Sequence, residues 1–152
     1  MSLAVGCGVA GLSIEDWSGE RMYDLELAVE RIAAAREAID REDPSIVLVG
    51  RNENFRIPGM SAAESIARAS AYARAGADCL FVPMLSDTGA VAELVAAVAP
   101  KPVNVLVHEY DDRIRTLAGL GVRRCSVGGS LALRSWNAFD VAAAELRELE
   151  GS

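Results

Sequence analysis

Five short apolar runs recur along the chain, and longer segments with helical periodicity separate and follow them. An apolar run rich in β-branched residues is typical of a strand that is covered on both faces. Strands that alternate with helices in series predict an α/β fold with a parallel sheet and right-handed crossovers. The predicted strands are residues 9–14, 46–49, 79–82, 103–107 and 124–127.

The segments between these runs carry apolar side chains at the spacing of one helix face. The stripes are Leu25, Ala28, Val29, Ile32, Ala35 and Ile39; Val91, Leu94, Val95 and Val98; and, on the last helix, Ala132, Trp136, Phe139, Ala143 and Leu146. A capping box is expected at Ser61 and Glu64, and Gly8, Gly76 and Gly121 stand where a helix is expected to end before a strand.

The periodicity leaves two architectures open, a flavodoxin-like open sheet and part of a (βα) barrel. Both bind ligands at the carboxyl ends of their parallel strands, so the residues that follow each run are the candidates for function. These residues are Glu15, Asp16, Arg51, Asn52, Glu53, Pro83, Ser86, His108, Gly128, Gly129 and Ser130.

Composition excludes several classes of protein. The formal net charge of -7 over 152 residues argues against nucleic acid or an anionic membrane as a partner, since both require a basic surface. A chain of this length predicts one domain, and its apolar runs are too short to span a bilayer, so a cytoplasmic protein is expected. Cys7, Cys79 and Cys125 lack the spacing of a disulfide framework or a zinc site and are expected to be buried thiols.

Two of the predicted strands end on charged residues. Alternation places Glu15 on the face of Gly11 and Ser13, with Asp16 on the opposite face, and it places Arg51 and Glu53 on the face of Val47 and Val49. Carboxylates suit Mg²⁺, which keeps several waters, and the guanidinium fork suits a substrate carboxylate. We therefore take Glu15 and Asp16 as candidate metal ligands and Arg51 and Glu53 as candidate catalytic residues. Alternatively, Arg51 only neutralises an acid in a salt bridge.

Further candidates follow the later strands. His108, the single histidine, is a candidate general base, although a lone histidine is more often a satisfied polar group. Gly128 and Gly129 are candidates for binding a substrate anion through backbone N–H groups, and a tight turn explains them equally well. Trp136 and Phe139 are expected to pack within the subunit or against a neighbour.

Six segments of the chain resemble, in order, the isocitrate lyase / phosphoenolpyruvate mutase superfamily, and in particular its phosphonomutase-like members. They are GVAGLSIED, YDLELAVERIAAAREAI, VGRNENF, ARASAYARAGADCLFVP, KPVNVLV and LAGLGVRRCSVGGSLALRSW. The resemblance implies a (βα)₈ barrel of which this chain supplies the fourth to eighth units. It also implies a Mg²⁺-dependent lyase, mutase or hydrolase that acts on C–C or P–C bonds of small 2-oxo acids through an enolate of pyruvate type.

The resemblance also assigns roles to residues. Glu15 falls on a glutamate near the metal, which it usually reaches through water. If Glu15 has this role, Asp16 is expected to orient the neighbourhood or to cap the loop. Arg51 falls on the arginine that binds the substrate carboxylate, Glu53 on the acid two residues later, and Asn104 in KPVNVLV is a further substrate-binding candidate. Members usually form oligomers in which the final helix packs on a neighbour.

Two departures from the family stand out. The aspartate-rich segment that holds the metal precedes the GVAG strand in the family, so we expect the chain to belong to a longer protein. The cysteine-bearing loop of the isocitrate lyases is absent, since residues 17–21 run directly into YDLELAVERI, and isocitrate cleavage is not expected. The rival interpretation is a non-catalytic partial barrel with a binding or assembly role. In a partial barrel, Ser13, Val47, Val49 and Val82 are expected to face water.

Overall fold

The computed structural model describes residues 2–108 and 111–150. Its described part contains five parallel strands, which pair in the order of the sequence, β1-β2-β3-β4-β5. The strands are β1 (Gly11–Glu15), β2 (Val47–Arg51), β3 (Cys79–Phe81), β4 (Val103–Leu106) and β5 (Arg124–Ser126). The helices are α1 (Ser2–Val5), α2 (Leu25–Glu42), η1 (Asn54–Arg56, a 3₁₀ turn), α3 (Ala62–Arg74), α4 (Thr88–Val98), α5 (Arg113–Gly119) and α6 (Ser130–Glu150).

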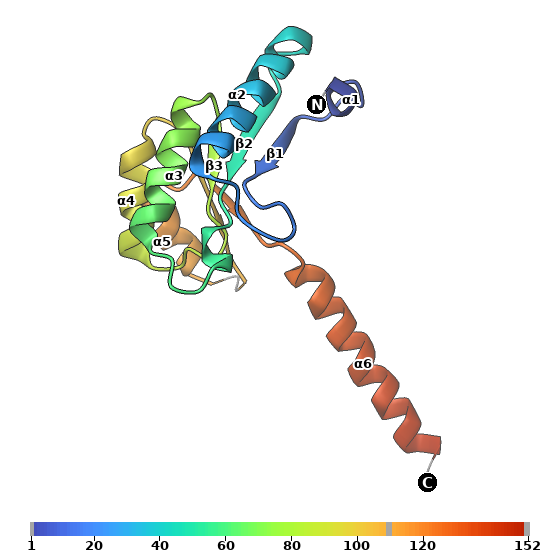
Figure 1. Cartoon of the computed structure of the whole chain (residues 1–152). Helices are drawn as coiled ribbons and strands as arrows, with labels where there is room; N and C mark the ends of the chain where they lie inside the picture. The colour runs from blue at the N-terminus through green and yellow to red at the C-terminus, as the bar shows by residue number, and fades with distance from the viewer. Residues whose placement is uncertain (1, 109–110, 151–152) are drawn as a thin grey trace.

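The strand order decides between the two predicted architectures. A flavodoxin-like sheet reverses direction after its second strand and carries helices on both faces, whereas this sheet advances by one strand at each crossover. Right-handed crossovers in one direction place α2, α3, α4 and α5 together on the outer side, as Figure 1 shows. The fold is therefore an arc of (βα) units from a TIM-type barrel, and the flavodoxin alternative is wrong.

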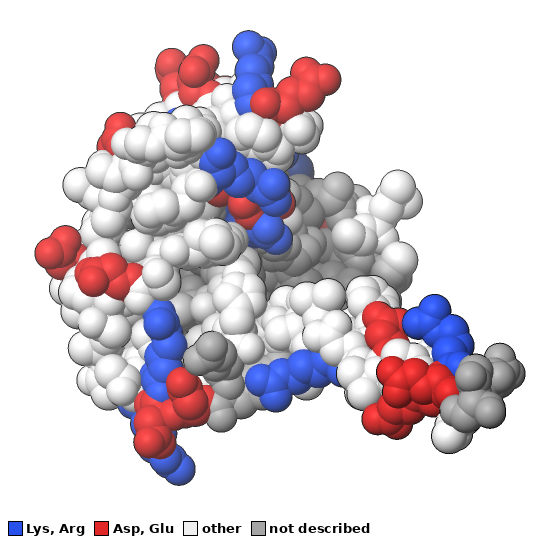
Figure 2. Space-filling view, turned by 90° about the horizontal axis from the view of Figure 1, so that it is seen from below, with Lys and Arg blue, Asp and Glu red and all other residues white. Residues whose placement is uncertain are grey.

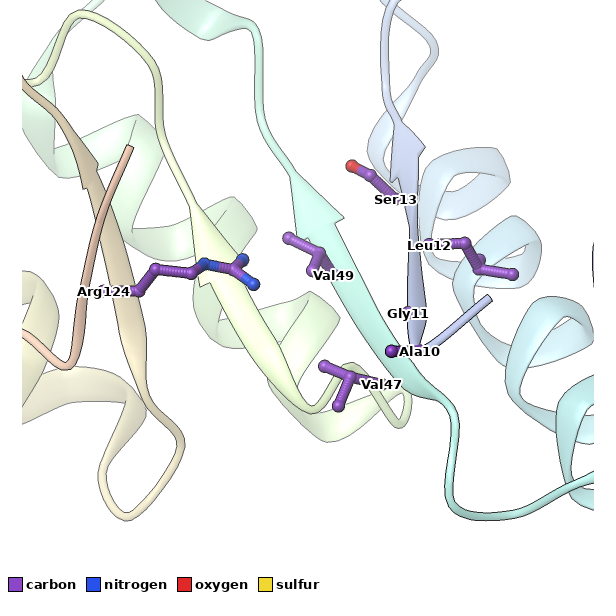
Figure 3. A pocket seen from close by; sticks show the side chains of 7 residues that line it. All are labelled: Ala10, Gly11, Leu12, Ser13, Val47, Val49 and Arg124. Atoms are coloured by element: carbon purple, nitrogen blue, oxygen red, sulfur yellow. The ribbon is translucent and has the colours of Figure 1, made fainter. Parts of the chain in front are cut away.

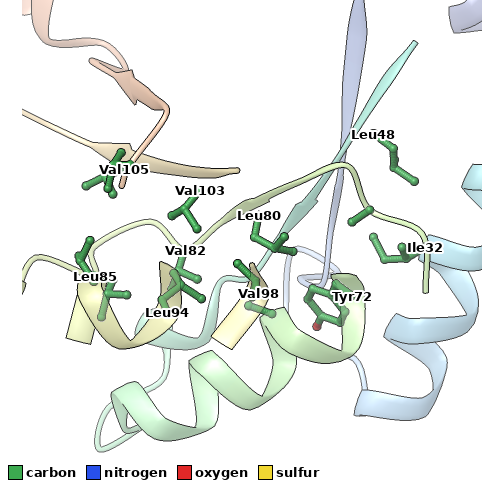
Figure 4. Packing of buried hydrophobic residues seen from close by; sticks show 14 of the residues in the cluster. Ile32, Leu48, Tyr72, Leu80, Val82, Leu85, Leu94, Val98, Val103 and Val105 are labelled. Atoms are coloured by element: carbon green, nitrogen blue, oxygen red, sulfur yellow. The ribbon is translucent and has the colours of Figure 1, made fainter. Parts of the chain in front are cut away.

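The hydrophobic core lies between the strands and the outer helices (Figure 4). Ile32 of α2, Tyr72 of α3, Val91 and Leu94 of α4 and Leu80 of β3 are almost completely buried in this core. The predicted stripes of α2 and α4 are confirmed, except that Leu25 at the start of α2 is 41% exposed, whereas the predicted stripe of α6 is not buried. Ser61 and Glu64 form the predicted capping box, and Gly8, Gly76 and Gly121 adopt positive φ angles before the strands.

The inner face of the arc is only partly exposed. Ser13 is exposed and Val47 is 39% exposed, as predicted, but Val49 is 7% exposed although its side chain is on that face. The prediction for Val82 is wrong, because it belongs to the outer core with Leu80 and is 2% exposed. The residues CLFV are apolar on both faces of β3, so their alternation does not reveal which side faces inwards.

Three smaller predictions also need correction. β1 begins at Gly11 rather than residue 9, and β2 runs to Arg51, so Glu15 and Arg51 are the last residues of their strands. Cys79 is buried, but Cys125 is partly exposed and Cys7 is exposed.

Within the described residues, no helix is long and apolar enough to cross a membrane.

Helix α6 projects away from the rest of the molecule (Figure 1). Packing of Trp136 and Phe139 within the subunit is not observed, since they are 64% and 71% exposed. The other large apolar side chains of the helix are also exposed: Leu131, Leu133, Val141, Leu146 and Leu149. The described part of the chain does not cover these apolar side chains, so only contact with another molecule could bury them.

Candidate active site at the strand ends

Glu15 and Arg51 lie side by side where β1 and β2 end. They are direct partners in the parallel register, so alternation places both side chains on the inner face. Arg51 Nε lies 3.6 Å from Glu15 Oε2, and each side chain is about one-third exposed, at 31% and 33%. Figure 2 views the end of the molecule toward which the strands run, where acidic and basic side chains gather in a hollow. The predicted juxtaposition of a carboxylate and a guanidinium at this rim is confirmed.

Glu53 is the centre of the charge network at the rim. It is 4% exposed, and its two carboxylate oxygens accept hydrogen bonds from two different arginines. Arg51 Nε donates to Oε1, and Arg56 Nε donates to Oε2 at 2.6 Å. The hydrogen bond and then the charge of Glu53 raise the pKa of Arg56. A buried carboxylate that is paired on both oxygens acts as an anchor for the two guanidinium groups.

Arg56 was not among the residues predicted from the sequence. It ends η1, three residues after Glu53, and its guanidinium carbon lies 5.8 Å from the centre of the Trp17 ring. Trp17 belongs to the tight segment after β1, where its backbone forms an isolated bridge with Met22. The sequence could have indicated this pair, because Glu53 and Arg56 are three residues apart and a short helical turn brings such side chains together.

Asp16 lies behind the rim, on the helix-facing side. It is 3% exposed, and its Oδ1 accepts from the backbone N–H of Glu53 at 2.8 Å. Its Oδ2 accepts from Asn52 Nδ2 at 3.1 Å and from the Tyr72 hydroxyl at 2.5 Å, with Arg68 Nη1 at 3.5 Å. Burial, followed by the bond to Asp16, raises the pKa of Tyr72. Both oxygens of Asp16 thus accept hydrogen bonds from the protein, and its predicted role as a metal ligand remains a prediction.

The loop after β2 is fixed by its asparagines. Asn52 and Asn54 are both completely buried. Asn54 donates its backbone N–H to Asn52 Oδ1 at 3.1 Å and its side-chain amide to Ser65 Oγ of α3 at 3.0 Å. The segment that carries Glu53 and Arg56 is thus tied to α3, and its side chains are held in place by the fold.

A cavity of about 560 Å³ lies on the inner face below the rim (Figure 3). Ser13 and Val49 line it, and each precedes a rim residue, Glu15 or Arg51, by two positions on the same strand face. Arg124 extends over it from β5, as Figure 3 shows. The cavity adjoins the rim network, although it does not include the charged side chains of that network.

Asn104 lies deeper on this inner face. It is 3% exposed, its amide donates to Ser126 Oγ at 3.0 Å, and its oxygen accepts from Arg124 Nε at 3.2 Å. Arg124 Nη2 also contacts Cys79 Sγ at 3.4 Å. The structure therefore gives Asn104 intramolecular partners and places it two residues before the end of β4. Its predicted substrate contact remains a prediction.

The other predicted residues follow β4 and β5. His108 is exposed and lines a second cavity of about 260 Å³ with Ser86 and Arg113. Gly128 has φ +53° and lies with Gly129 between β5 and α6, so a turn with a positive φ explains at least the first glycine. In the sheet order, β4 is separated from β2 by β3, so His108 is not a neighbour of Arg51. Its catalytic role, and substrate binding by Gly128 and Gly129, remain predictions.

The described residues fit part of a magnesium site. They contain no group of three His, Cys, Asp or Glu side chains that converge on one point. Asp16 and Glu53 are engaged by donors on both oxygens, which leaves the inner-facing Glu15 as the carboxylate suited to a cation, directly or through water. Mg²⁺ is often held by one or two protein carboxylates with waters and substrate oxygens.

Comparison with known proteins identifies the family. The sequence model described as phosphoenolpyruvate phosphomutase matches residues 2–147. The chain belongs to this family. It is therefore a member of the predicted superfamily, which includes the isocitrate lyases and 2,3-dimethylmalate lyase.

Individual relatives agree with this assignment. An uncharacterised protein of Mycobacterium tuberculosis is 36% identical over 120 residues, which is 78% of this chain and 44% of that protein. Oxaloacetate decarboxylase of Rhodopseudomonas palustris is 36% identical over 104 residues, which is 64% of this chain and 35% of the enzyme. A solved structure from Burkholderia cenocepacia, provisionally classed as a lyase/mutase, is 39% identical with a TM-score of 0.89 and is matched over 95% of this chain and 54% of its own.

This chain thus spans between about a third and about half of the length of these relatives. Among these relatives, the decarboxylase acts on oxaloacetate, and the Burkholderia protein is described as a lyase/mutase.

Proposed function

We propose that the protein containing these 152 residues is a Mg²⁺-dependent lyase, mutase or hydrolase of small 2-oxo acids, acting on C–C or P–C bonds through a pyruvate-enolate-type intermediate. The observation that carries the proposal is the pairing of Arg51 with Glu15 at the ends of adjacent strands, on the inner face where barrel enzymes bind substrate. We assign the chain to the fourth to eighth units of the barrel.

Arg51 is oriented for carboxylate binding. Its Nε is held by Glu53, and the described residues supply no hydrogen-bond acceptor to its two Nη nitrogens. The ring of Phe81 lies 5.4 Å from its guanidinium carbon and limits its movement further. The Nη edge is therefore available to a substrate carboxylate, and Glu53 acts by positioning Arg51 rather than by touching the substrate.

Glu15 provides the contact to the cation. When bound, Mg²⁺ supplies electrostatic stabilisation for the negative charge that develops on a substrate oxygen. Glu15 would hold the ion, directly or through water, and Arg51 would bind the substrate carboxylate beside it. His108 is the candidate for proton transfer, and Gly128 and Gly129 for contact with a second substrate group.

Oxalate, a mimic of the pyruvate enolate, tests the joint role of metal and arginine. We expect the complete gene product that carries these residues to bind oxalate by calorimetry in Mg²⁺ and to lose that binding in EDTA. Arg51→Ala is expected to abolish binding, whereas the exposed Arg41→Ala on α2 is a matched control. Equal affinity in Mg²⁺ and in EDTA would refute the proposal.

A non-catalytic partial barrel is the second candidate. It is favoured by the absence, within the described residues, of a complete group of metal ligands. The two candidates differ in turnover, which is measured as pyruvate release from oxaloacetate. Release that depends on Mg²⁺ supports the enzyme, while a folded protein without release supports the binding or assembly role.

We also propose that the protein is a homo-oligomer in which α6 packs on a neighbouring subunit. The support is the exposed apolar surface of α6, including Trp136 and Phe139. Burial of such side chains against a partner favours association by roughly 1.5–3 kcal/mol each. Sedimentation is expected to show an oligomer that Trp136→Asp dissociates and the adjacent control Asn137→Asp preserves. A wild-type monomer at micromolar concentration would contradict this assembly.

A further inference from the structure

Arg56 is a second guanidinium at the rim, and the proposed reaction does not yet use it. It is bound through Nε to the same buried carboxylate that holds Arg51, on the other oxygen. The Trp17 ring covers its guanidinium at 5.8 Å, although the side chain remains 51% exposed. Arg56 is therefore accessible from solvent and still restrained by two contacts.

The two arginines are equivalent in how they are anchored. Each donates through Nε, and the described residues supply no hydrogen-bond acceptor to the Nη nitrogens of either. The two oxygens of one carboxylate are bonded to the same carbon atom, so guanidinium groups bound to them are neighbours. The Nη edges of Arg51 and Arg56 are thus both available at one small region of the rim.

Neutralisation of Glu53 requires only one of these cations. Glu53 is 4% exposed, and Arg51 already pairs with it, while Glu15 lies within 4 Å of Arg51. Arg56 is the second arginine on this carboxylate. The side chains of Glu15, Glu53, Arg51 and Arg56 together carry two positive and two negative charges. A divalent cation bound at Glu15 would leave this region strongly positive, and that charge favours a ligand with two anionic groups.

We propose that Arg56 binds the second anionic group of the substrate, a carboxylate or a phosphonate, while Arg51 binds the carboxylate next to the 2-oxo group. This assignment rests on the proposed function and adds to it a preference for dianionic 2-oxo acids. Trp17 and Glu53 act as positioning residues for Arg56, because the ring and the carboxylate fix the direction of its Nη edge.

The test compares ligands that differ in the second anionic group. Calorimetry of the complete gene product in Mg²⁺ uses pyruvate, with one carboxylate, 3,3-difluorooxaloacetate, with two, and 3-phosphonopyruvate, with a phosphonate. We expect Arg56→Ala to weaken binding of at least one dianionic ligand about tenfold or more, as the loss of a charged hydrogen bond implies, and to change pyruvate affinity less than twofold. Arg56→Lys is expected to recover part of the loss, and Arg41→Ala to change nothing.

The outcomes separate the possibilities. A loss confined to difluorooxaloacetate identifies a second carboxylate, and a loss confined to phosphonopyruvate identifies a phosphonate. Equal losses for pyruvate and both dianions, no loss for any ligand, or a wild-type protein without preference for dianions would overturn the assignment of Arg56. Binding that persists unchanged in EDTA contradicts the Mg²⁺-dependent function instead, and the effect of Arg56→Ala is still read from the same titrations. A wild-type protein that binds none of the three overturns both.

Discussion

Replacing Asp16 with asparagine tests whether this residue holds the rim together. The carboxylate is 3% exposed and accepts hydrogen bonds from Asn52, Tyr72 and the backbone of Glu53, with Arg68 at 3.5 Å. An amide has one oxygen, so in either orientation of Asp16→Asn its NH₂ group faces at least one of these donors. The substitution preserves volume and removes the charge.

The expected loss follows from these contacts. One hydrogen bond to a charged group contributes about 1.5–3 kcal/mol, and the bonds that remain lose the assistance of the charge. Removing one member of a buried ion pair costs about 3–5 kcal/mol, which sets the upper limit for the pair with Arg68. We expect Asp16→Asn to lower the free energy of unfolding by about 3 kcal/mol, and Tm by about 6–12 °C for a chain of this size.

Thermal unfolding followed by far-ultraviolet circular dichroism measures this loss. Glu20→Gln is the matched control, since Glu20 is exposed on the neighbouring loop, and it is expected to change stability by less than about 0.5 kcal/mol. A Tm for Asp16→Asn within 2 °C of the wild type, about the shift that 0.5–1 kcal/mol produces, would refute the positioning role. A loss seen only in the presence of Mg²⁺ would instead support Asp16 as a metal ligand.

Further predictions concern the same region. Tyr72→Phe, which removes the 2.5 Å bond to Asp16, is expected to cost about 1.5–3 kcal/mol in urea unfolding. Because burial raises the pKa of Tyr72 in the folded state, wild-type stability is expected to fall as pH rises above about 10, and the variant to lack this contribution. Gly50→Ala would place Cβ 3.0 Å from Tyr72 Cβ and 3.1 Å from Ala77 Cβ, so we expect a loss of about 1–3 kcal/mol in the same assay. Arg51→Lys is expected to weaken oxalate binding by about 1–3 kcal/mol with Tm unchanged, whereas a collapse of Tm would make Arg51 structural.

The sequence predicted the units of the fold well because their signals are local. The capping box at Ser61 needs only Glu64, and the alternation that brings Glu15 and Arg51 to one face needs only a few residues of each strand. The carboxyl ends of parallel strands meet at one edge, so the rim could be located before the topology was known. The barrel architecture could be distinguished from the open sheet only by the strand order, which the periodicity of the sequence does not reveal.

The contacts that the sequence did not reveal are those between distant segments. Asp16 is bound by Arg68 and Tyr72, which lie 52 and 56 residues later on α3. Neither side chain interrupts its helix pattern, so nothing in the sequence singles them out. Arg56 was missed for a related reason, since an arginine in a polar loop is usually solvated, and its value as a candidate depends on sharing Glu53 with Arg51.

Glu15 and Asp16, the adjacent acids at the end of β1, therefore lie on opposite faces of the sheet. Asp16 uses all of its oxygen contacts to fasten the loop after β2 to α3, and that loop in turn carries Glu53. Glu53 gives both oxygens to guanidinium groups, and to accept a proton it would have to break one of these pairs. Of the predicted catalytic groups, His108 is exposed and lines the second cavity, and its role in proton transfer remains a prediction. Glu15 therefore remains the predicted contact for a cation, while Glu53 pairs with Arg51 and Arg56 and Asp16 binds the loop that carries Glu53.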